Sequence, residues 1–157
     1  FFEMPPVNPN AVTRRHAYVQ AMEGLGHAPQ ILHVDGDHWG FEDIGFTQGV
    51  RLFAERKLPS DTVLCSNDRL AIGLLAAAYE KGLRVGRGPG CAMRIAGHDD
   101  HPWSRFTCPA LTTVAQDYEM IAERSVEALF ALVDAGHPTG VPDQTLLEGR
   151  LVMRASA

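Results

Sequence analysis

Two polar clusters hold the side chains of this 157-residue sequence that are best suited to bind a ligand. The first is the tripeptide 66–68 (SND), which directly follows the apolar run 62–65. The second is the tetrapeptide 97–100 (GHDD), which directly follows the largely apolar run 93–96. Such runs are typical of buried strands in a parallel sheet, whose ligands bind at the carboxyl ends of the strands. The sequence therefore predicts one ligand site that both clusters line.

The first cluster also fits a structural role. Asn67 or Asp68 stands at the start of the helical run 69–81, where either residue type is a natural N-cap. Gly82 directly follows this run and is a natural residue to end the helix. One residue of the pair can cap the helix while its neighbour faces a ligand, so both roles remain open.

A run of four residues, His98, Asp99, Asp100 and His101, has the side chains of a metal site, because imidazole and carboxylate groups both ligate metal ions. Adjacent residues of an extended segment point to opposite sides, however. Four such residues in a row therefore do not converge on one ion, and we expect no metal site.

Catalytic motifs are absent from the sequence. It contains no G-x-S-x-G, no H-E-x-x-H and no G-K-[ST]. Cys65 ends a predicted strand and is a candidate nucleophile, because the N-terminus of a following helix lowers the pKa of a thiol. A cysteine buried in a core strand is the alternative. We expect a protein that is not an enzyme and that uses no cofactor.

The composition is that of a globular protein. Hydrophobic residues make up 45% of the chain and charged residues 21%, and no apolar run approaches the roughly 18 residues that span a bilayer. The 14 basic and 19 acidic residues give a net charge of −5, which argues against a nucleic-acid-binding surface on this chain. Three cysteines without a C-x-x-C pair favour a reducing cytoplasm. The chain does not begin with methionine, so we expect residues upstream.

Strands and helices alternate along the predicted chain. Prolines and asparagines predict a loop over residues 1–10, and hydrophobic periodicity with chain-breaking residues predicts the elements after it. Helices are expected at 11–25, 42–57, 69–81 and 116–135, and strands at 30–34, 62–65, 93–96, 112–114 and within 144–153. This order predicts right-handed crossovers and an α/β fold, with a parallel sheet flanked by helices.

Three segments in this order resemble the effector-binding domain of the LacI/GalR family of bacterial transcriptional regulators. They are the strand–Asn–Asp–helix element at 62–81, G-x-D-D at 97–100, and P-x-L-T-T-V-x-Q at 109–116 before a long helix. The resemblance covers about residues 11–155. It implies a periplasmic-binding-protein-like fold of type I, in which two α/β subdomains joined by three crossing strands hold an effector between them.

The resemblance also implies how the chain divides. Residues 11–115 correspond to the C-terminal subdomain, residues 116–140 to a hinge crossing and a helix towards the N-terminal subdomain, and residues 141–157 to closing strands. The chain is then a partial effector-binding domain. The DNA-binding headpiece of the family has no counterpart in it.

The positions that match the cleft of the family imply a set of ligand-binding side chains. This set is Arg15, Trp39, Asn67, Asp99, Gln116 and Tyr118. In a sugar site, the Asp99 carboxylate would accept hydrogen bonds from hydroxyl groups, the Arg15 guanidinium would donate them and the Asn67 amide would do both. Trp39 would stack on a sugar face. His98 departs from the family pattern, which usually has an aromatic residue at that position.

The resemblance implies the effector-sensing and dimerisation part of a cytoplasmic regulator. Its expected partners are a small metabolite such as a sugar, operator DNA through a headpiece outside this chain, and a second copy of the chain, with no membrane. The helix at 70–78 and the loop at 101–108 are candidates for the dimer interface. The alternative is a periplasmic sugar-binding receptor of a transport system. The segment 109–116 and the unpaired cysteines favour the regulator.

Overall fold

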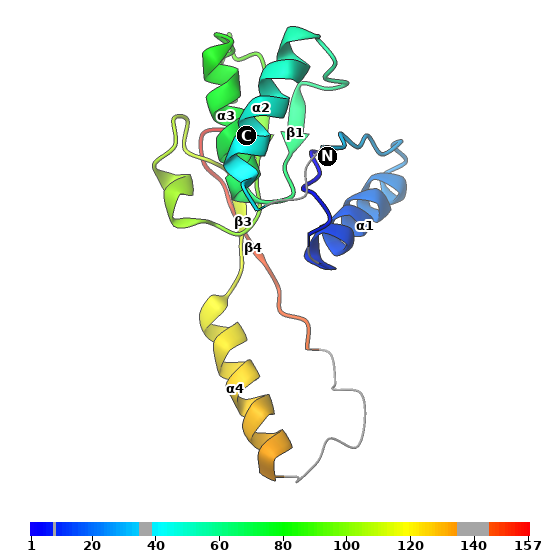
Figure 1. The fold of residues 1–157 in the computed structure, drawn as a ribbon, viewed down its shortest axis with the longest axis vertical. Coiled ribbons are helices and arrows are strands. Elements are labelled where there is room, and N and C mark those ends of the chain that lie inside the picture. Colours follow the sequence, from blue (N-terminus) through cyan, green and yellow to red (C-terminus); the bar gives the residue numbers. More distant parts are fainter. Residues whose placement is uncertain (8, 35–38, 135–144) are drawn as a thin grey trace.

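The computed structural model of the chain describes residues 1–7, 9–34, 39–134 and 145–157 (Figure 1). Within these residues the helices are α1 (Pro9–Gly24), α2 (Phe41–Ala54), α3 (Asp68–Glu80) and α4 (Tyr118–Asp134), with a 3-10 turn at Pro102–Arg105. The strands are β1 (Thr62–Leu64), β2 (Arg94–Ala96), β3 (Thr113–Ala115) and β4 (Arg150–Val152). The predicted helices and the strands at β1, β2, β3 and β4 are confirmed, with ends that differ by a few residues.

Some expectations lie outside the described residues. They are the loop residues 35–38 beside Trp39, the predicted end of the last helix at residue 135, and the start of the closing segment at 141–144.

The sheet is parallel through its centre. β1 pairs in parallel with β2, with Val63 opposite Ile95. Single bridges extend the parallel order, from Phe2 to Cys65 on one side and from Ala96 to Thr112 on the other. β3 then pairs antiparallel with β4. The expected α/β fold is confirmed, and the carboxyl ends of β1 and β2 lie at one edge of the sheet.

The prediction of a loop over residues 1–10 is wrong at its beginning. Phe2 is completely buried and forms parallel bridges to both Cys65 and Leu32. Its main-chain N–H donates to the carbonyl of Leu64 at 2.8 Å, so the opening residues act as a sheet strand. The apolar pair Phe1 and Phe2 is too short to show a strand period, and the prolines that follow favoured the prediction of a loop. In place of the strand predicted at 30–34, the structure has a single parallel bridge between Leu32 and Phe2.

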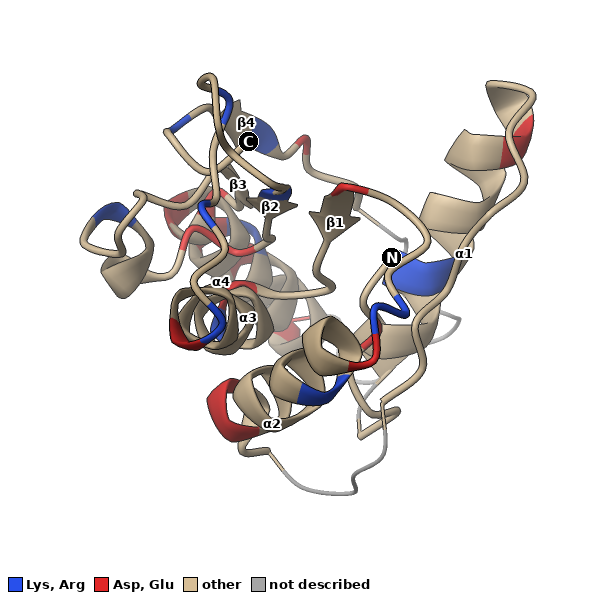
Figure 2. Ribbon diagram, turned by 90° about the horizontal axis from the view of Figure 1, so that it is seen from above, with Lys and Arg blue, Asp and Glu red and all other residues tan. Residues whose placement is uncertain are grey.

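α2 and α3 pack against each other through glycine. A Cβ atom added to Gly73 would lie 2.1 Å from the carbonyl oxygen of Glu42, and one added to Gly45 would lie 2.2 Å from that of Leu70. The two helix backbones are therefore in direct contact, which a side chain at either position would prevent. Figure 2 shows α2 and α3 side by side, with α1 on a different side of β1. Both helices contribute to the core, α2 through Phe41 and Ile44 and α3 through Leu70 and Leu74.

α4 stands apart from the other helices and is joined to them by the strands β3 and β4 (Figure 1). None of its residues is buried, although Val126, Leu129, Phe130 and Val133 are large apolar side chains. An amphipathic helix normally covers its apolar face with another part of the protein. No helix in the described part of the chain is both long and apolar enough to cross a lipid bilayer.

Candidate functional site

The first predicted cluster caps α3. The Asn67 side-chain oxygen accepts a hydrogen bond from the main-chain N–H of Leu70 at 2.8 Å, and its amide group donates to the sulfur of Met4 at 3.4 Å. Asn67 is 5% exposed. The capping role is therefore confirmed, and both polar groups of this side chain are engaged inside the protein.

The second predicted cluster turns sharply out of β2. Asp99 and Asp100 have φ angles of 118° and 49°, a region that residues other than glycine rarely adopt. The N–H of Asp99 donates to the carbonyl of Val114 at 2.9 Å, which ties the turn to β3. Strained backbone of this kind persists only where the surrounding structure holds it, and it is concentrated at functional sites.

Asp99 is the centre of a polar cluster. Its Oδ1 lies 2.5 Å from Nη2 of Arg14, and its Oδ2 accepts from Nη1 of Arg14 at 3.3 Å. The amide of Gln116 donates to Oδ1 at 2.7 Å, and Nδ1 of His98 lies 3.1 Å from the same oxygen. The hydroxyl of Tyr118 donates to the main-chain carbonyl of Asp99 at 2.9 Å. Residues from α1, the segment after β2, the β3–α4 connection and α4 thus meet at Asp99.

The surroundings keep Asp99 ionised. Burial by itself would raise the pKa of this carboxyl group, but hydrogen bonds from His98 and Arg14 and their charges hold the pKa below its ordinary value. The pKa of the Tyr118 hydroxyl is raised, first by burial and then by the negative charge of Asp99. At neutral pH the site therefore presents a carboxylate, a guanidinium, an amide and a neutral phenol.

The neighbouring aspartate has a different role. The Asp100 carboxylate lies 2.6 Å from Nη2 of Arg154, and Nη1 of the same arginine donates to the carbonyl of Leu111 at 2.8 Å. Asp100 therefore holds the segment after β4 against the sheet. Of the two adjacent carboxylates, Asp99 is the one directed at the polar cluster.

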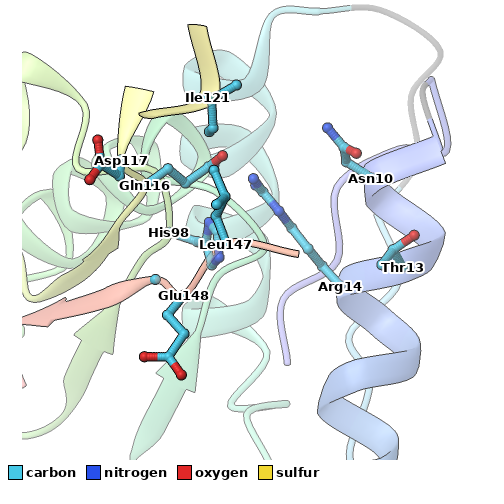
Figure 3. A pocket seen from close by; sticks show the side chains of 10 residues that line it. Asn10, Thr13, Arg14, His98, Gln116, Asp117, Ile121, Leu147 and Glu148 are labelled. Atoms are coloured by element: carbon cyan, nitrogen blue, oxygen red, sulfur yellow. The ribbon is translucent and has the colours of Figure 1, made fainter. Parts of the chain in front are cut away.

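An open cavity of about 250 Å³ lies beside this cluster (Figure 3). Figure 3 shows the Arg14 side chain reaching from α1 towards Gln116 and His98. α4 and the segment before β4 supply the facing wall through Ile121 and Leu147. The polar part of the lining includes Asn10, Thr13, Arg14, His98, Gln116 and Glu148.

Three of the six predicted side chains come together, namely Asp99, Gln116 and Tyr118. The arginine that joins them is Arg14 rather than the predicted Arg15, whose guanidinium lies 3.8 Å from Glu3. Successive helix residues point about 100° apart, so only one of two adjacent arginines can face the site.

The other two predicted side chains, Trp39 and Asn67, do not join the cluster. Trp39 is 56% exposed and contacts Phe41, with 5.7 Å between the ring centroids. Asn67 caps α3, as described above.

The residues considered for metal binding or catalysis have other partners. His101 accepts from the N–H of Trp103 at 3.3 Å, whereas His98 contacts Asp99 and Asp100 contacts Arg154. Cys65 is completely buried, and burial raises the pKa of its thiol, which disfavours the nucleophilic thiolate. Among the described residues no three His, Cys, Asp or Glu side chains form a group that could hold a metal ion.

Comparisons with known proteins define the class. The sequence pattern of the periplasmic binding protein-like domain family matches residues 2–157. The lactose operon repressor of Klebsiella pneumoniae is 36% identical over 95 residues, which are 60% of this chain and 25% of that repressor. The PurR transcriptional repressor of Mannheimia succiniciproducens is 33% identical over 150 residues, 92% of this chain and 42% of PurR.

A solved structure of the Lac repressor bound to ONPG in the repressed state superposes with a TM-score of 0.84. Its sequence is 28% identical, and the match covers 99% of this chain and 44% of that one. The chain belongs to the periplasmic binding protein-like domain family. Within that family the resemblance to the LacI-type regulators is confirmed, because these relatives are transcriptional repressors. Transcriptional repressors are not enzymes. The chain spans less than half the length of each of these three relatives.

Proposed function

We propose that this chain is the effector-sensing part of a bacterial transcriptional regulator and that a small polyol, above all a sugar, binds beside Asp99. The observation that carries the proposal is the contact of Asp99 with Arg14 and Gln116, two residues that line the cavity. A carboxylate accepts from hydroxyl groups, a guanidinium donates to them and an amide does both. This combination suits a ligand with several hydroxyl groups in fixed positions.

The cavity fits one half of a binding cleft. At about 250 Å³ it is smaller than the roughly 300–1,000 Å³ of pockets that enclose drug-sized ligands. We propose that residues 11–115 form one lobe, that 116–140 form a hinge crossing and a helix towards a second lobe outside this chain, and that 141–157 supply the closing strands. The uncovered apolar residues of α4 would pack in that second lobe. The greater length of the relatives supports this division.

Effector binding would act through the contacts of Asp99. In the structure its carboxylate is occupied by Arg14 and Gln116, so effector hydroxyl groups must share or replace these hydrogen bonds. Gln116 also lies two residues before α4, the element that leads towards the proposed second lobe. A ligand that binds one closure of the lobes more tightly than another shifts the balance between them. That shift would change the affinity of a headpiece elsewhere in the protein for operator DNA.

The regulator would work in the cytoplasm as a homodimer. All three cysteines are free, which suits a reducing compartment. Trp103 and Phe106 are 66% and 73% exposed, and their rings lie edge to face with centroids 6.4 Å apart. Exposed aromatic pairs of this kind are frequent anchors of protein interfaces. The second copy of the chain is the proposed partner of this surface.

The test is titration calorimetry on the full-length protein with ONPG and with a panel of monosaccharides and disaccharides. We expect at least one of these compounds to bind saturably and to change the affinity of the protein for its operator DNA. Asp99→Ala should abolish the binding while circular dichroism shows an unchanged fold. A wild-type protein that binds none of these compounds would contradict the sugar effector, and unchanged binding by Asp99→Ala would contradict the site.

A further inference from the structure

Asp68 is a completely buried carboxylate at the first position of α3. Thr113 donates its hydroxyl to Oδ1 at 2.6 Å, and Ser104 donates its hydroxyl to Oδ2 at 2.6 Å. The main-chain N–H of His101 also donates to Oδ2, at 2.8 Å. A buried carboxylate requires such donors, and the N-terminus of a helix further favours a negative charge. Asp68 lines none of the cavity described above.

These donors belong to the segment that carries Asp99 or to the strand beside it. We call residues 97–104 the aspartate loop. Two of its members, His101 and Ser104, contact the Asp68 carboxylate, and the N–H of Asp68 donates to the carbonyl of His98 at 2.8 Å. The third donor, Thr113, belongs to β3. Asp68 thus joins α3, the aspartate loop and β3.

The aspartate loop is also in close contact with Asp68 where the loop begins. A Cβ atom added to Gly97 would lie 2.1 Å from Oδ1 of Asp68, so only glycine allows this approach. Asp99 and Asp100, which have left-handed backbone conformations, come two and three residues after Gly97 in the sequence. The N–H of Asp100 donates to the Thr113 hydroxyl at 3.3 Å, and that hydroxyl donates in turn to Asp68. The strained residues Asp99 and Asp100 therefore lie between contacts that involve the Asp68 carboxylate, at Gly97 before them and at His101 after them.

We propose that Asp68 is the positioning residue of the effector site. By holding the aspartate loop on both sides of its strained turn, Asp68 keeps the Asp99 carboxylate directed at Arg14 and Gln116, which line the cavity. The inference rests on the proposed function in one respect, namely that the positioned carboxylate binds an effector. If Asp68 only stabilised α3, its replacement would loosen the helix and the sheet around it. If Asp68 is a positioning residue, its replacement loosens the aspartate loop first.

The experiment is hydrogen exchange followed by mass spectrometry on the full-length protein. Asp68→Asn keeps the shape of the side chain but leaves only one oxygen acceptor for three donors. Ser104→Ala removes one donor and leaves the carboxylate in place. We expect both variants to speed exchange of peptides from the aspartate loop about tenfold or more, while peptides of α2 and β1 change less than twofold. Asp43→Asn, which removes an exposed charge from the first turn of α2, is the matched control and should leave the loop unchanged.

A second pair of variants keeps the test decisive if Asp68→Asn does not fold. Thr113→Val removes the hydroxyl with little change in volume, whereas Thr113→Ser keeps it. Fast exchange of the aspartate loop in Thr113→Val and wild-type exchange in Thr113→Ser would support the positioning role. Loop exchange within twofold of wild type in both Ser104→Ala and Thr113→Val would overturn it. A uniform increase over the whole protein would also overturn it, because that result describes a general stabilising role.

Binding measurements separate this inference from the proposed function. If wild-type protein binds ONPG or a sugar of the panel, Ser104→Ala should weaken that binding about tenfold, and Thr113→Ser should bind like wild type. Absence of binding by the wild type contradicts the sugar effector, and the exchange measurements still decide whether Asp68 holds the aspartate loop. Intact binding in Ser104→Ala despite a loosened loop would overturn the positioning of Asp99.

Discussion

Arg14 and Asp99 form a forked ion pair across the site, although 85 positions separate them in the sequence. Nη2 of the guanidinium meets one carboxylate oxygen and Nη1 the other. The pair connects α1 to the segment after β2, and the cavity is lined by Arg14 from α1 and by His98 from that segment. The position of Arg14 in the cavity lining therefore depends on the position of Asp99 at the end of the sheet.

The two adjacent arginines of α1 make a matched test of the site. Arg14→Ala should weaken binding of ONPG or of the sugar that the panel identifies by tenfold or more, because charge-assisted hydrogen bonds are strong. Arg15→Ala should change the affinity less than twofold, since its guanidinium lies near Glu3 and away from the cluster. Titration calorimetry on both variants measures the difference. Equal losses, or a larger loss in Arg15→Ala, would contradict the assignment of Arg14.

The stability of the protein should depend on the ionisation of Asp99. The pKa of this carboxyl is lowered in the folded state, whereas an unfolded aspartate has a pKa of about 3.9. Its stabilising contribution is therefore fully present above about pH 4 and is lost as the pH falls through the lower folded pKa. Urea denaturation at pH 7 and at pH 3 should show a smaller loss of stability in Asp99→Asn than in wild type. An identical pH dependence in the two proteins would contradict the role of this carboxylate.

The contact between α2 and α3 should not tolerate a methyl group. Gly73→Ala places a Cβ atom against the carbonyl of Glu42 and should lower the free energy of unfolding by about 1–3 kcal/mol or more. Gly24→Ala is the control, because no atom lies within 4 Å of the added Cβ atom at the end of α1. That change should be neutral or stabilising by up to about 1 kcal/mol. Chemical denaturation measures both values, and a neutral Gly73→Ala would rule out the direct backbone contact.

The aromatic surface of Trp103 and Phe106, at the end of the aspartate loop and just beyond it, should govern assembly. Phe106→Asp introduces a charge into the proposed interface and should weaken dimerisation tenfold or more. Leu25→Asp, at a residue that is 72% exposed at the far end of α1, should leave dimerisation unchanged. Sedimentation of the full-length variants at several concentrations measures the effect. A dimer that is equally stable in Phe106→Asp would exclude this surface as the interface.

Much of the local structure could be predicted from the sequence because its signals are short-range. Asn67 or Asp68 was predicted as the N-cap of the helical run that follows, and the hydrogen bond from the N–H of Leu70 identifies Asn67 as the cap. Gly82, predicted to end this helix, has a φ of 68°, a value at which glycine avoids the strain of a side chain. The GHDD segment after a strand predicted the edge where Asp99 meets Gln116 and Tyr118.

Other features depend on contacts between distant parts of the chain. The opening strand at Phe2 exists because both of its neighbours, Leu32 and Cys65, come from distant parts of the chain. The choice between Arg14 and Arg15 depends on how α1 is rotated against the sheet, and α1 buries only Ala11 among its residues. Periodicity cannot set that rotation when a helix has so little buried surface.

The α/β class and the edge of the sheet at which the polar residues gather were predicted from residue spacing within single elements and from the order of the elements along the chain. The family was indicated by the resemblance of three segments, at 62–81, 97–100 and 109–116. The different directions of the two aspartates depend on long-range packing: Asp68 turns inward to Ser104 and Thr113, whereas Asp99 turns outward to Arg14. The two side chains are chemically identical, and their roles differ because folding surrounds Asp68 with buried donors and places Asp99 against Arg14 and Gln116, two residues that line the cavity.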